Sequence, residues 1–228
     1  MKKIIGIPGW KTGENSFGCT IPYLDFGNEY GSVRILDIDD FDAGLDLLIL
    51  PGGPDVDPSR YGTKPHYLTS RPDPMKEYFD LFTLPKYIEA GIPVFGICRG
   101  MQSLAVHFGA ILIQDMDHET NESDKRGSKV HELRMEDNPS ASVIAKSIGK
   151  IHRVNSMHHQ CVSGIGFPFD ELDIIAGRPQ DPKRHYPPCI EAIKHKTLPI
   201  FGVQYHPEEL DNDNLSEYIM NNLLKIDD

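Results

Sequence analysis

The chain has 228 residues, of which 39% are hydrophobic and 25% are charged, a composition typical of a globular protein with one sizeable core. Its formal net charge is −11 and basic residues form no dense run, which argues against nucleic acid as a partner. No stretch approaches 18 consecutive apolar residues, so we expect no membrane span.

Short apolar runs alternate with helical patterns in the first half of the chain. The expected strands are 3–7, 33–37, 47–50 and 94–97, and the expected helices are 22–30, 75–90 and 99–108. Pro85 predicts a kink or a two-piece helix within 75–90. This alternation predicts an α/β domain with a mostly parallel sheet.

The second half is richer in short strands, expected at 130–135, 172–176, 190–193 and 200–203, before an amphipathic helix at 214–226. The stretches 51–74 and 114–129 are expected to be surface loops, where ligands bind in such folds. Repeats and interdomain linkers are absent from the sequence, which predicts a single domain over 1–228. The four scattered cysteines form no disulfide framework, so we expect a reducing, cytoplasmic location.

Cys98 is the first candidate for chemistry, because it stands between the apolar run 94–97 and the helical pattern 99–108. A cysteine at such a junction lies in a tight turn of the kind called a nucleophile elbow. The following helix N-terminus favours the thiolate, and Gly96 and Gly100 leave room for the bend. The alternative is a buried, inert cysteine.

A thiol nucleophile needs a base, and the base needs an orienting group. His206 follows the expected strand 200–203, which predicts that it lies at the same sheet edge as Cys98. Glu208, two residues later, can accept from the imidazole and fix its tautomer. The alternative is a solvated histidine beside a helix that begins at Pro-Glu-Glu.

Acyl chemistry also needs N–H donors for an oxyanion. The run 47–50 ends in Pro51-Gly52-Gly53, which suits the presentation of a backbone N–H. The N–H groups of Gly53 and Arg99 are the candidates, although an ordinary Pro-Gly turn explains the first segment equally well.

Three histidines, His152, His158 and His159, raise the possibility of a metal site. Zinc sites need three or four converging ligands, whereas adjacent side chains on an extended segment point in opposite directions. We therefore expect no metal here and no cofactor. A polar segment that contacts an amino-acid head group fits this stretch better.

Taken together, several segments resemble the class I glutamine amidotransferase superfamily, and within it the peptidase C26 group of γ-glutamyl hydrolases, which includes γ-glutamyl-γ-aminobutyrate hydrolases. They occur in the family's order over about 47–209, and the matching stretches are 51–58 with 61–62, 96–102, 114–115, 155–160 and 202–208. Each is a weak signal alone, but the ordered set is highly specific.

The resemblance implies a flavodoxin-like three-layer α/β sandwich with a mostly parallel central sheet. It implies that Cys98 is the nucleophile, His206 the base and Glu208 the orienting group. It also implies that the backbones of Gly53 and Arg99 form an oxyanion hole. The implied glutamyl pocket contains Gln102, Ser156, His158 and His159.

The expected activity is hydrolysis of a small γ-glutamyl amine through a γ-glutamyl thioester, with the amine unidentified. The first alternative is a glutaminase subunit that delivers ammonia to a partner synthetase. A less favoured alternative is a non-catalytic binding protein on the same fold. The sequence leaves a homo-oligomer open, and a synthetase partner is expected only under the first alternative.

Overall fold

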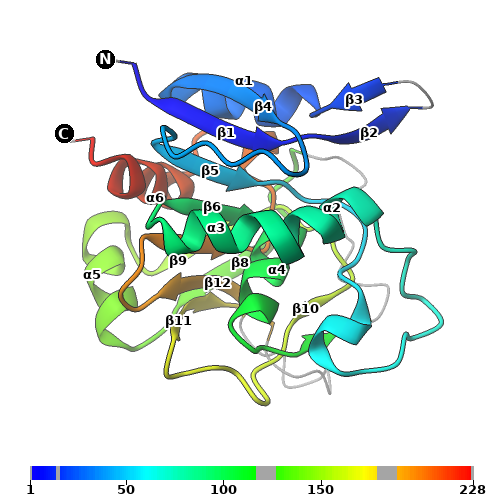
Figure 1. The fold of residues 1–228 in the computed structure, drawn as a ribbon. Helices are drawn as coiled ribbons and strands as arrows, with labels where there is room; N and C mark the ends of the chain where they lie inside the picture. Colours follow the sequence, from blue (N-terminus) through cyan, green and yellow to red (C-terminus); the bar gives the residue numbers. More distant parts are fainter. Residues whose placement is uncertain (1, 14–15, 117–126, 179–188, 227–228) are drawn as a thin grey trace.

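The computed structural model describes residues 2–13, 16–116, 127–178 and 189–226. Among them, eleven strands form one sheet, whose main path runs β4–β1–β5–β6–β13–β12–β11–β8–β9 (Figure 1). The first five strands on this path are parallel: β4 (Ser32–Leu36), β1 (Ile4–Pro8), β5 (Leu47–Leu50), β6 (Val94–Ile97) and β13 (Ile200–Val203).

The sheet continues beyond β13 with antiparallel pairs. These strands are β12 (Ile190–His195), β11 (Leu172–Gly177), β8 (His131–Met135) and β9 (Ile151–Val154). Two short strands, β10 (Cys161–Val162) and β7 (Leu112–Ile113), extend from β12. A separate hairpin pairs β2 (Trp10–Gly13) with β3 (Ser16–Gly18).

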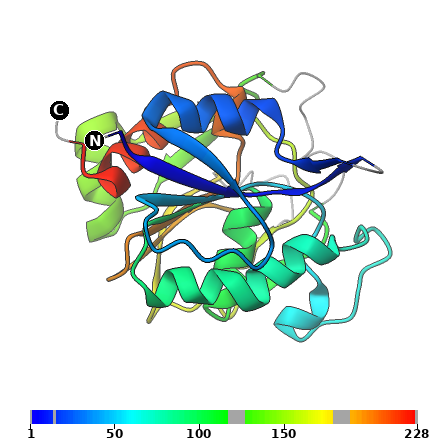
Figure 2. The same cartoon turned by 45° about the horizontal axis from the view of Figure 1, so that its top comes forward.

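Helices cover both faces of the sheet, as Figure 2 shows. On one face lie α1 (Ile21–Tyr30), α5 (Pro139–Ile148) and α6 (Asn214–Leu224). On the other lie α4 (Arg99–His107) and a two-piece helix formed by α2 (Pro74–Tyr78) and α3 (Leu84–Glu89). Short 3₁₀ turns occupy Pro58–Tyr61 and Pro207–Glu209. The predicted three-layer α/β sandwich is therefore confirmed.

The central strands are apolar at every position because each face of the sheet is covered. On β5, Leu47 and Ile49 pack towards α1 and α6, while Leu48 and Leu50 pack towards α3 and α4. All four are buried. Alternate side chains of a strand point to opposite faces, so a strand between two helical layers needs apolar residues throughout.

The break predicted at Pro85 is present as a π turn over Phe79–Thr83, between α2 and α3. Pro85 has no N–H to donate to the preceding turn, which explains why regular hydrogen bonding stops there. The helix α5 was not expected, although Asn138 caps it by accepting from the Ala141 N–H and Pro139 begins it. The hairpin β2–β3 and the strand β9 were also not expected.

The predicted loop 114–129 is only partly described by the structure. Of the polar stretch 114–129, positions 117–126 lie outside the described residues. None of the helices in the described ranges has the length and apolar character needed to cross a membrane. All four cysteines are free thiols.

Candidate active site

Cys98 lies between β6 and α4 in a strained backbone conformation, with φ 52° and ψ −108°. Left-handed values are costly for a residue with a side chain and cluster at functional sites. Gly100 permits the turn, because a Cβ on it would lie 2.1 Å from the Leu50 carbonyl oxygen. A Cβ on Gly96 would lie 2.7 Å from the Gly100 carbonyl carbon. The predicted elbow is thus present.

The topology brings His206 to the same sheet edge as Cys98. Strands β6 and β13 are parallel neighbours with Val203 opposite Ile97, and the two candidate residues follow the ends of these strands. The Nδ1 atom of His206 lies 2.6 Å from Oε1 of Glu208. Because this carboxylate occupies Nδ1, Nε2 is the nitrogen left for the thiol.

The pKa of His206 is raised by its interaction with Cys98. Burial alone lowers this pKa, but the charge of Cys98 and its hydrogen bond outweigh burial, and Glu208 adds to them, so the pKa rises from 6.5 to about 10. A protonated imidazole beside the sulfur stabilises a thiolate. The sulfur and the imidazole therefore interact as a nucleophile and its base would.

Two residues outside the predicted set hold this histidine. The Asn155 side chain makes two hydrogen bonds to the backbone of His206. Its amide nitrogen donates to the His206 carbonyl at 2.9 Å, and its amide oxygen accepts from the His206 N–H at 2.8 Å. The Tyr23 hydroxyl, on α1, lies 3.4 Å from Nδ1 of His206 and accepts from the Gly52 N–H at 2.8 Å. Burial is the main cause that raises the pKa of Tyr23 well above 10, so its hydroxyl keeps its proton.

The sulfur also receives a hydrogen bond from a buried amide. Gln204 Nε2 donates to Cys98 Sγ at 3.6 Å. In turn, Gln102 Nε2 donates to Gln204 Oε1 and to the Gln160 carbonyl, each at 3.1 Å. Gln102, expected in the glutamyl pocket, is thus 3% exposed and its amide nitrogen is engaged within the protein.

The two proposed oxyanion donors lie at this same edge. Strands β5 and β6 are parallel neighbours with Leu50 opposite Gly96, so Gly53 and Arg99 follow adjacent strand ends. The Gly52 N–H is used by Tyr23, which makes Gly53 the next donor along the loop. The N–H of Arg99 opens α4, whose first turn receives no side-chain cap.

The Arg99 side chain turns away from the sulfur into a buried ionic network. Its guanidinium lies 2.6 Å from Glu77 Oε1 and 2.7 Å from Asp80 Oδ2. Arg60 contacts the same two carboxylates and the Ser103 hydroxyl. Burial raises the pKa of Asp80, but the charges of Arg99 and then Arg60 outweigh it and lower that pKa below 3.8. The network anchors the first residue of α4 to the α2–π-turn segment.

A buried lysine borders the loop that contains Gly53. Lys76 is 6% exposed, its Nζ lies 3.9 Å from the centre of the Trp10 ring, and a Cβ on Gly53 would lie 2.6 Å from its Cε. Burial first, and then the charge of Arg99, lower the Lys76 pKa from 10.5 to about 7. This side chain therefore titrates near neutral pH.

The remaining predicted pocket residues lie in different surroundings. Ser156 and His158 are buried, and His158 faces Glu191 in the interior. The His159 imidazole is 31% exposed and lies between Asp55, at 3.2 Å, and Asp115, at 3.4 Å. The two adjacent histidines thus have separate partners. The structure does not bring Ser156 and His158 to an open surface beside the sulfur.

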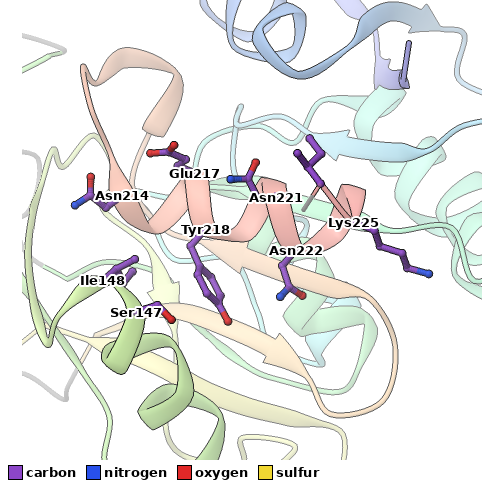
Figure 3. Close-up of a pocket in the computed structure, with 9 residues that line it drawn as sticks. Ser147, Ile148, Asn214, Glu217, Tyr218, Asn221, Asn222 and Lys225 are labelled. Carbon is purple, nitrogen blue, oxygen red and sulfur yellow. The ribbon is translucent and has the colours of Figure 1, made fainter. Parts of the chain in front are cut away.

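A cavity of about 490 Å³ lies between α5 and α6 (Figure 3). Asn214, Glu217, Asn221 and Lys225 of α6 line it, opposite Ser147 of α5. Its described lining includes no cysteine and no histidine. It therefore offers no nucleophile comparable with Cys98.

Sequence comparison gives a family match that includes the site. The model of the family Peptidase C26 matches residues 34–208, a range that contains Cys98, His206 and Glu208. The glutamine amidotransferase-like protein YvdE of Lactococcus lactis subsp. lactis is 31% identical over 170 residues, or 72% of this chain and 66% of that protein. The gamma-glutamyl-gamma-aminobutyrate hydrolase of Escherichia coli O157:H7 is 28% identical over 192 residues, or 79% of this chain and 69% of that protein. The matches span from 51% to 66% of the first three curated relatives.

Solved structures share the fold over almost the whole chain. The glutaminase domain of Trypanosoma brucei CTPS with bound acivicin has a TM-score of 0.63 at 15% identity, covering 99% of this chain and 95% of that one. A glutamine amidotransferase of Thermotoga maritima has a TM-score of 0.59 at 15% identity, covering 100% of this chain and 87% of that one. At such identities the likeness concerns the fold alone.

Proposed function

The chain belongs to the peptidase C26 family of the class I glutamine amidotransferase superfamily, and we propose that it hydrolyses the γ-glutamyl amide bond of a small γ-glutamyl amine. The observation that carries the proposal is the position of Cys98 and His206 after neighbouring parallel strands, with Nδ1 of His206 2.6 Å from Oε1 of Glu208. A relative named gamma-glutamyl-gamma-aminobutyrate hydrolase supports the substrate class.

In the first half-reaction, the Cys98 thiolate attacks the γ-carbonyl carbon of the substrate. The N–H groups of Gly53 and Arg99 stabilise the oxyanion, a contribution worth about 10²–10³-fold in rate for each donor. The protonated His206 then donates its proton to the amine nitrogen as the C–N bond breaks. The products of this step are the free amine and a γ-glutamyl thioester on Cys98.

In the second half-reaction, neutral His206 takes a proton from water, whose oxygen attacks the thioester carbonyl. Collapse of the tetrahedral species releases glutamate and regenerates the thiolate–imidazolium pair. Glu208 stabilises the imidazolium and keeps Nε2 directed at the reacting atoms. Acid–base catalysis of this kind contributes roughly 10²–10⁴-fold.

The test is a mass-spectrometric screen of the purified protein against a panel of γ-glutamyl amines, with glutamate release as the readout. We expect turnover of at least one member and loss of that turnover in Cys98→Ala. Cys19→Ser is the matched control, because Cys19 is a free thiol that has no part in the proposed set of Cys98, His206 and Glu208, and it should keep wild-type activity. Turnover retained by Cys98→Ala would contradict the assigned nucleophile.

Free glutamine belongs in the same panel, because it separates the proposal from a glutaminase subunit. Efficient use of γ-glutamyl amines with poor use of glutamine supports the proposal. Slow use of glutamine alone, accelerated by a synthetase, would support the ammonia-delivering alternative. Labelling of Cys98 by a glutamine-like chloroketone distinguishes both enzymes from a non-catalytic binding protein.

A further inference from the structure

A second group of chemistry-bearing side chains lies in the interior and has no part in the proposed reaction. His158, Cys189 and Glu191 each offer one ligand atom, and these three atoms lie within 4.8 Å of one another. All three residues are buried, with exposed fractions of 6%, 2% and 0%. Glu191 lies on β12, Cys189 immediately precedes that strand, and His158 belongs to the segment that follows β9.

One buried polar atom of this group has no hydrogen-bond partner within the described part of the chain. Nε2 of His158 is inaccessible to solvent and unpaired, whereas Glu191 Oε1 lies 3.2 Å from His131 Nε2. Leaving a buried polar atom unsatisfied costs about 1–3 kcal/mol. A native structure rarely accepts this cost without a ligand or another compensation.

The imidazole of His158 presents a lone pair to this group. Its Nδ1 lies 2.9 Å from the Gln160 carbonyl oxygen, which can only accept, so Nδ1 carries the hydrogen. In the neutral imidazole, Nε2 is then the nitrogen with the free lone pair. Its Nε2 lone pair then faces Glu191 Oε1 at 3.9 Å, so two acceptors oppose each other.

We propose that His158, Cys189 and Glu191 bind a zinc-class divalent cation. Imidazole nitrogen, thiolate sulfur and carboxylate oxygen are the three donor types that Zn²⁺ uses in proteins. On binding, the Cys189 thiol releases one proton to solvent and its sulfur bonds to the metal. The thiolate and the carboxylate supply two negative charges and the imidazole none, so the buried cation is neutralised.

The distances and the surrounding residues fit such a site. Zinc bonds of about 2.0–2.3 Å place tetrahedral ligand atoms about 3.3–3.8 Å apart, so atoms that now lie within 4.8 Å of one another would approach by up to about 1.5 Å. Metal-binding histidines donate their other N–H to a carbonyl or carboxylate, as His158 does to Gln160. His131 Nε2 lies 3.2 Å from Glu191 Oε1 and orients that carboxylate.

The metal would fasten the segment 155–160 to β12. This segment supports the proposed active site at two points, because Asn155 holds the backbone of His206 and the Gln160 carbonyl accepts from Gln102. An occupied site should therefore stabilise the fold and stiffen the support of the catalytic histidine without contacting the substrate.

The experiment measures metal binding in a Cys98→Ala background, which removes the thiol that Zn²⁺ would otherwise find beside His206. The chelator-treated full chain is titrated with Zn²⁺ against a chromophoric chelator, and separately with Co²⁺. We expect one metal ion per chain, visible bands of a tetrahedral cobalt site, and a near-ultraviolet charge-transfer band from a thiolate. The melting temperature should rise on addition of Zn²⁺.

Adding Cys189→Ser should remove the charge-transfer band and weaken Zn²⁺ binding by at least the 10–100-fold that loss of a supporting residue typically costs. Glu191→Gln should weaken binding as well. Cys19→Ser is the matched control and should leave affinity and spectrum unchanged. Less than stoichiometric zinc in the Cys98→Ala parent, or equal affinity in folded Cys189→Ser, would overturn the proposal. Because these readouts do not require turnover, they are independent of the outcome of the substrate screen.

Discussion

Asn155 binds the main chain of His206 through both ends of its amide, at 2.9 Å and 2.8 Å, across 51 positions of sequence. The backbone of the histidine is thus held independently of its imidazole. We therefore expect Asn155 to position the proposed catalytic histidine while it contributes no proton to the reaction.

We expect Asn155→Ala to reduce kcat by about 10²-fold, the cost of displacing a catalytic group by roughly 1 Å, with a smaller effect on KM. Asn155→Asp keeps an acceptor for the His206 N–H but turns a charged oxygen towards the His206 carbonyl, so it should lose at least as much kcat. Steady-state kinetics on the substrate found in the screen measure both values. Wild-type kcat in either variant, with intact folding, would argue against this positioning role.

Tyr23→Phe removes the hydroxyl that the Gly52 N–H donates to at 2.8 Å. The orphaned buried N–H should lower the free energy of unfolding by about 1–3 kcal/mol, measured by urea denaturation. We also expect lower kcat, because the same hydroxyl lies 3.4 Å from His206 Nδ1. Tyr30→Phe, on the same helix, is the matched control and should change neither quantity appreciably.

Glu208→Gln should lower the His206 pKa from about 10 towards 6.5 while Cys98 still holds it above that value. A pKa raised in the folded state gives stability that is complete below about pH 6.5 and is lost as the pH rises through 10. The variant should lose this stability at a lower pH. NMR titration of the imidazole and the basic limb of the kcat/KM profile test the shift; an unchanged limb would contradict it.

Lys76 has the opposite effect on the pH dependence of stability, because burial lowers its pKa from 10.5 to about 7. The unfolded chain binds more protons between these values, so Lys76 makes the protein more stable as the pH rises from 7 to 10. Lys76→Met should remove this rise and stabilise the protein at pH 6 by an amount on the order of a few kcal/mol. Urea denaturation at pH 6 and pH 9 compares the two chains. A parallel pH dependence in both would refute the assignment.

Gly100→Ala tests the close approach of α4 to β5. Its new Cβ would lie 2.1 Å from the backbone oxygen of Leu50, which cannot move aside as a flexible side chain can. We expect destabilisation of about 3 kcal/mol or more, measured by thermal denaturation, and loss of Cys98 reactivity. Gly164→Ala is the control, since a Cβ there meets nothing within 4 Å.

The central strands could be predicted from sequence because their signal is local. The bounds of β5, β6 and β13 agree with prediction, since each is a short apolar run that ends at a glycine-rich or polar segment. The sheet-edge position of Cys98 and His206 could be predicted for the same reason: Cys98 follows β6 directly, and His206 lies three residues after the end of β13. Glu208 needed only its two-residue spacing from the histidine.

The supporting residues could not be predicted in this way, because their roles depend on tertiary contacts. Tyr23 reaches His206 across 183 positions, only because α1 packs against the Pro207–Glu209 turn. Gln204 lies within a matching segment, but its bond to the sulfur depends on the adjacency of β6 and β13. The helix α5 was missed for another reason, since its Asn138-Pro139 start signal was present in the sequence.

The π turn at Phe79–Thr83 determines how α3 is rotated about the helix axis relative to α2. One residue fewer there would turn α3 by about 100° relative to α2. Glu77 could then keep its hold on Arg99 only if Leu84 and Tyr87, both fully buried, rotated out of the hydrophobic interior. The extra residue of the π turn thus allows Glu77 to bind Arg99 while Leu84 and Tyr87 stay in the hydrophobic core. We therefore expect insertions and deletions in this turn to be far less tolerated than substitutions.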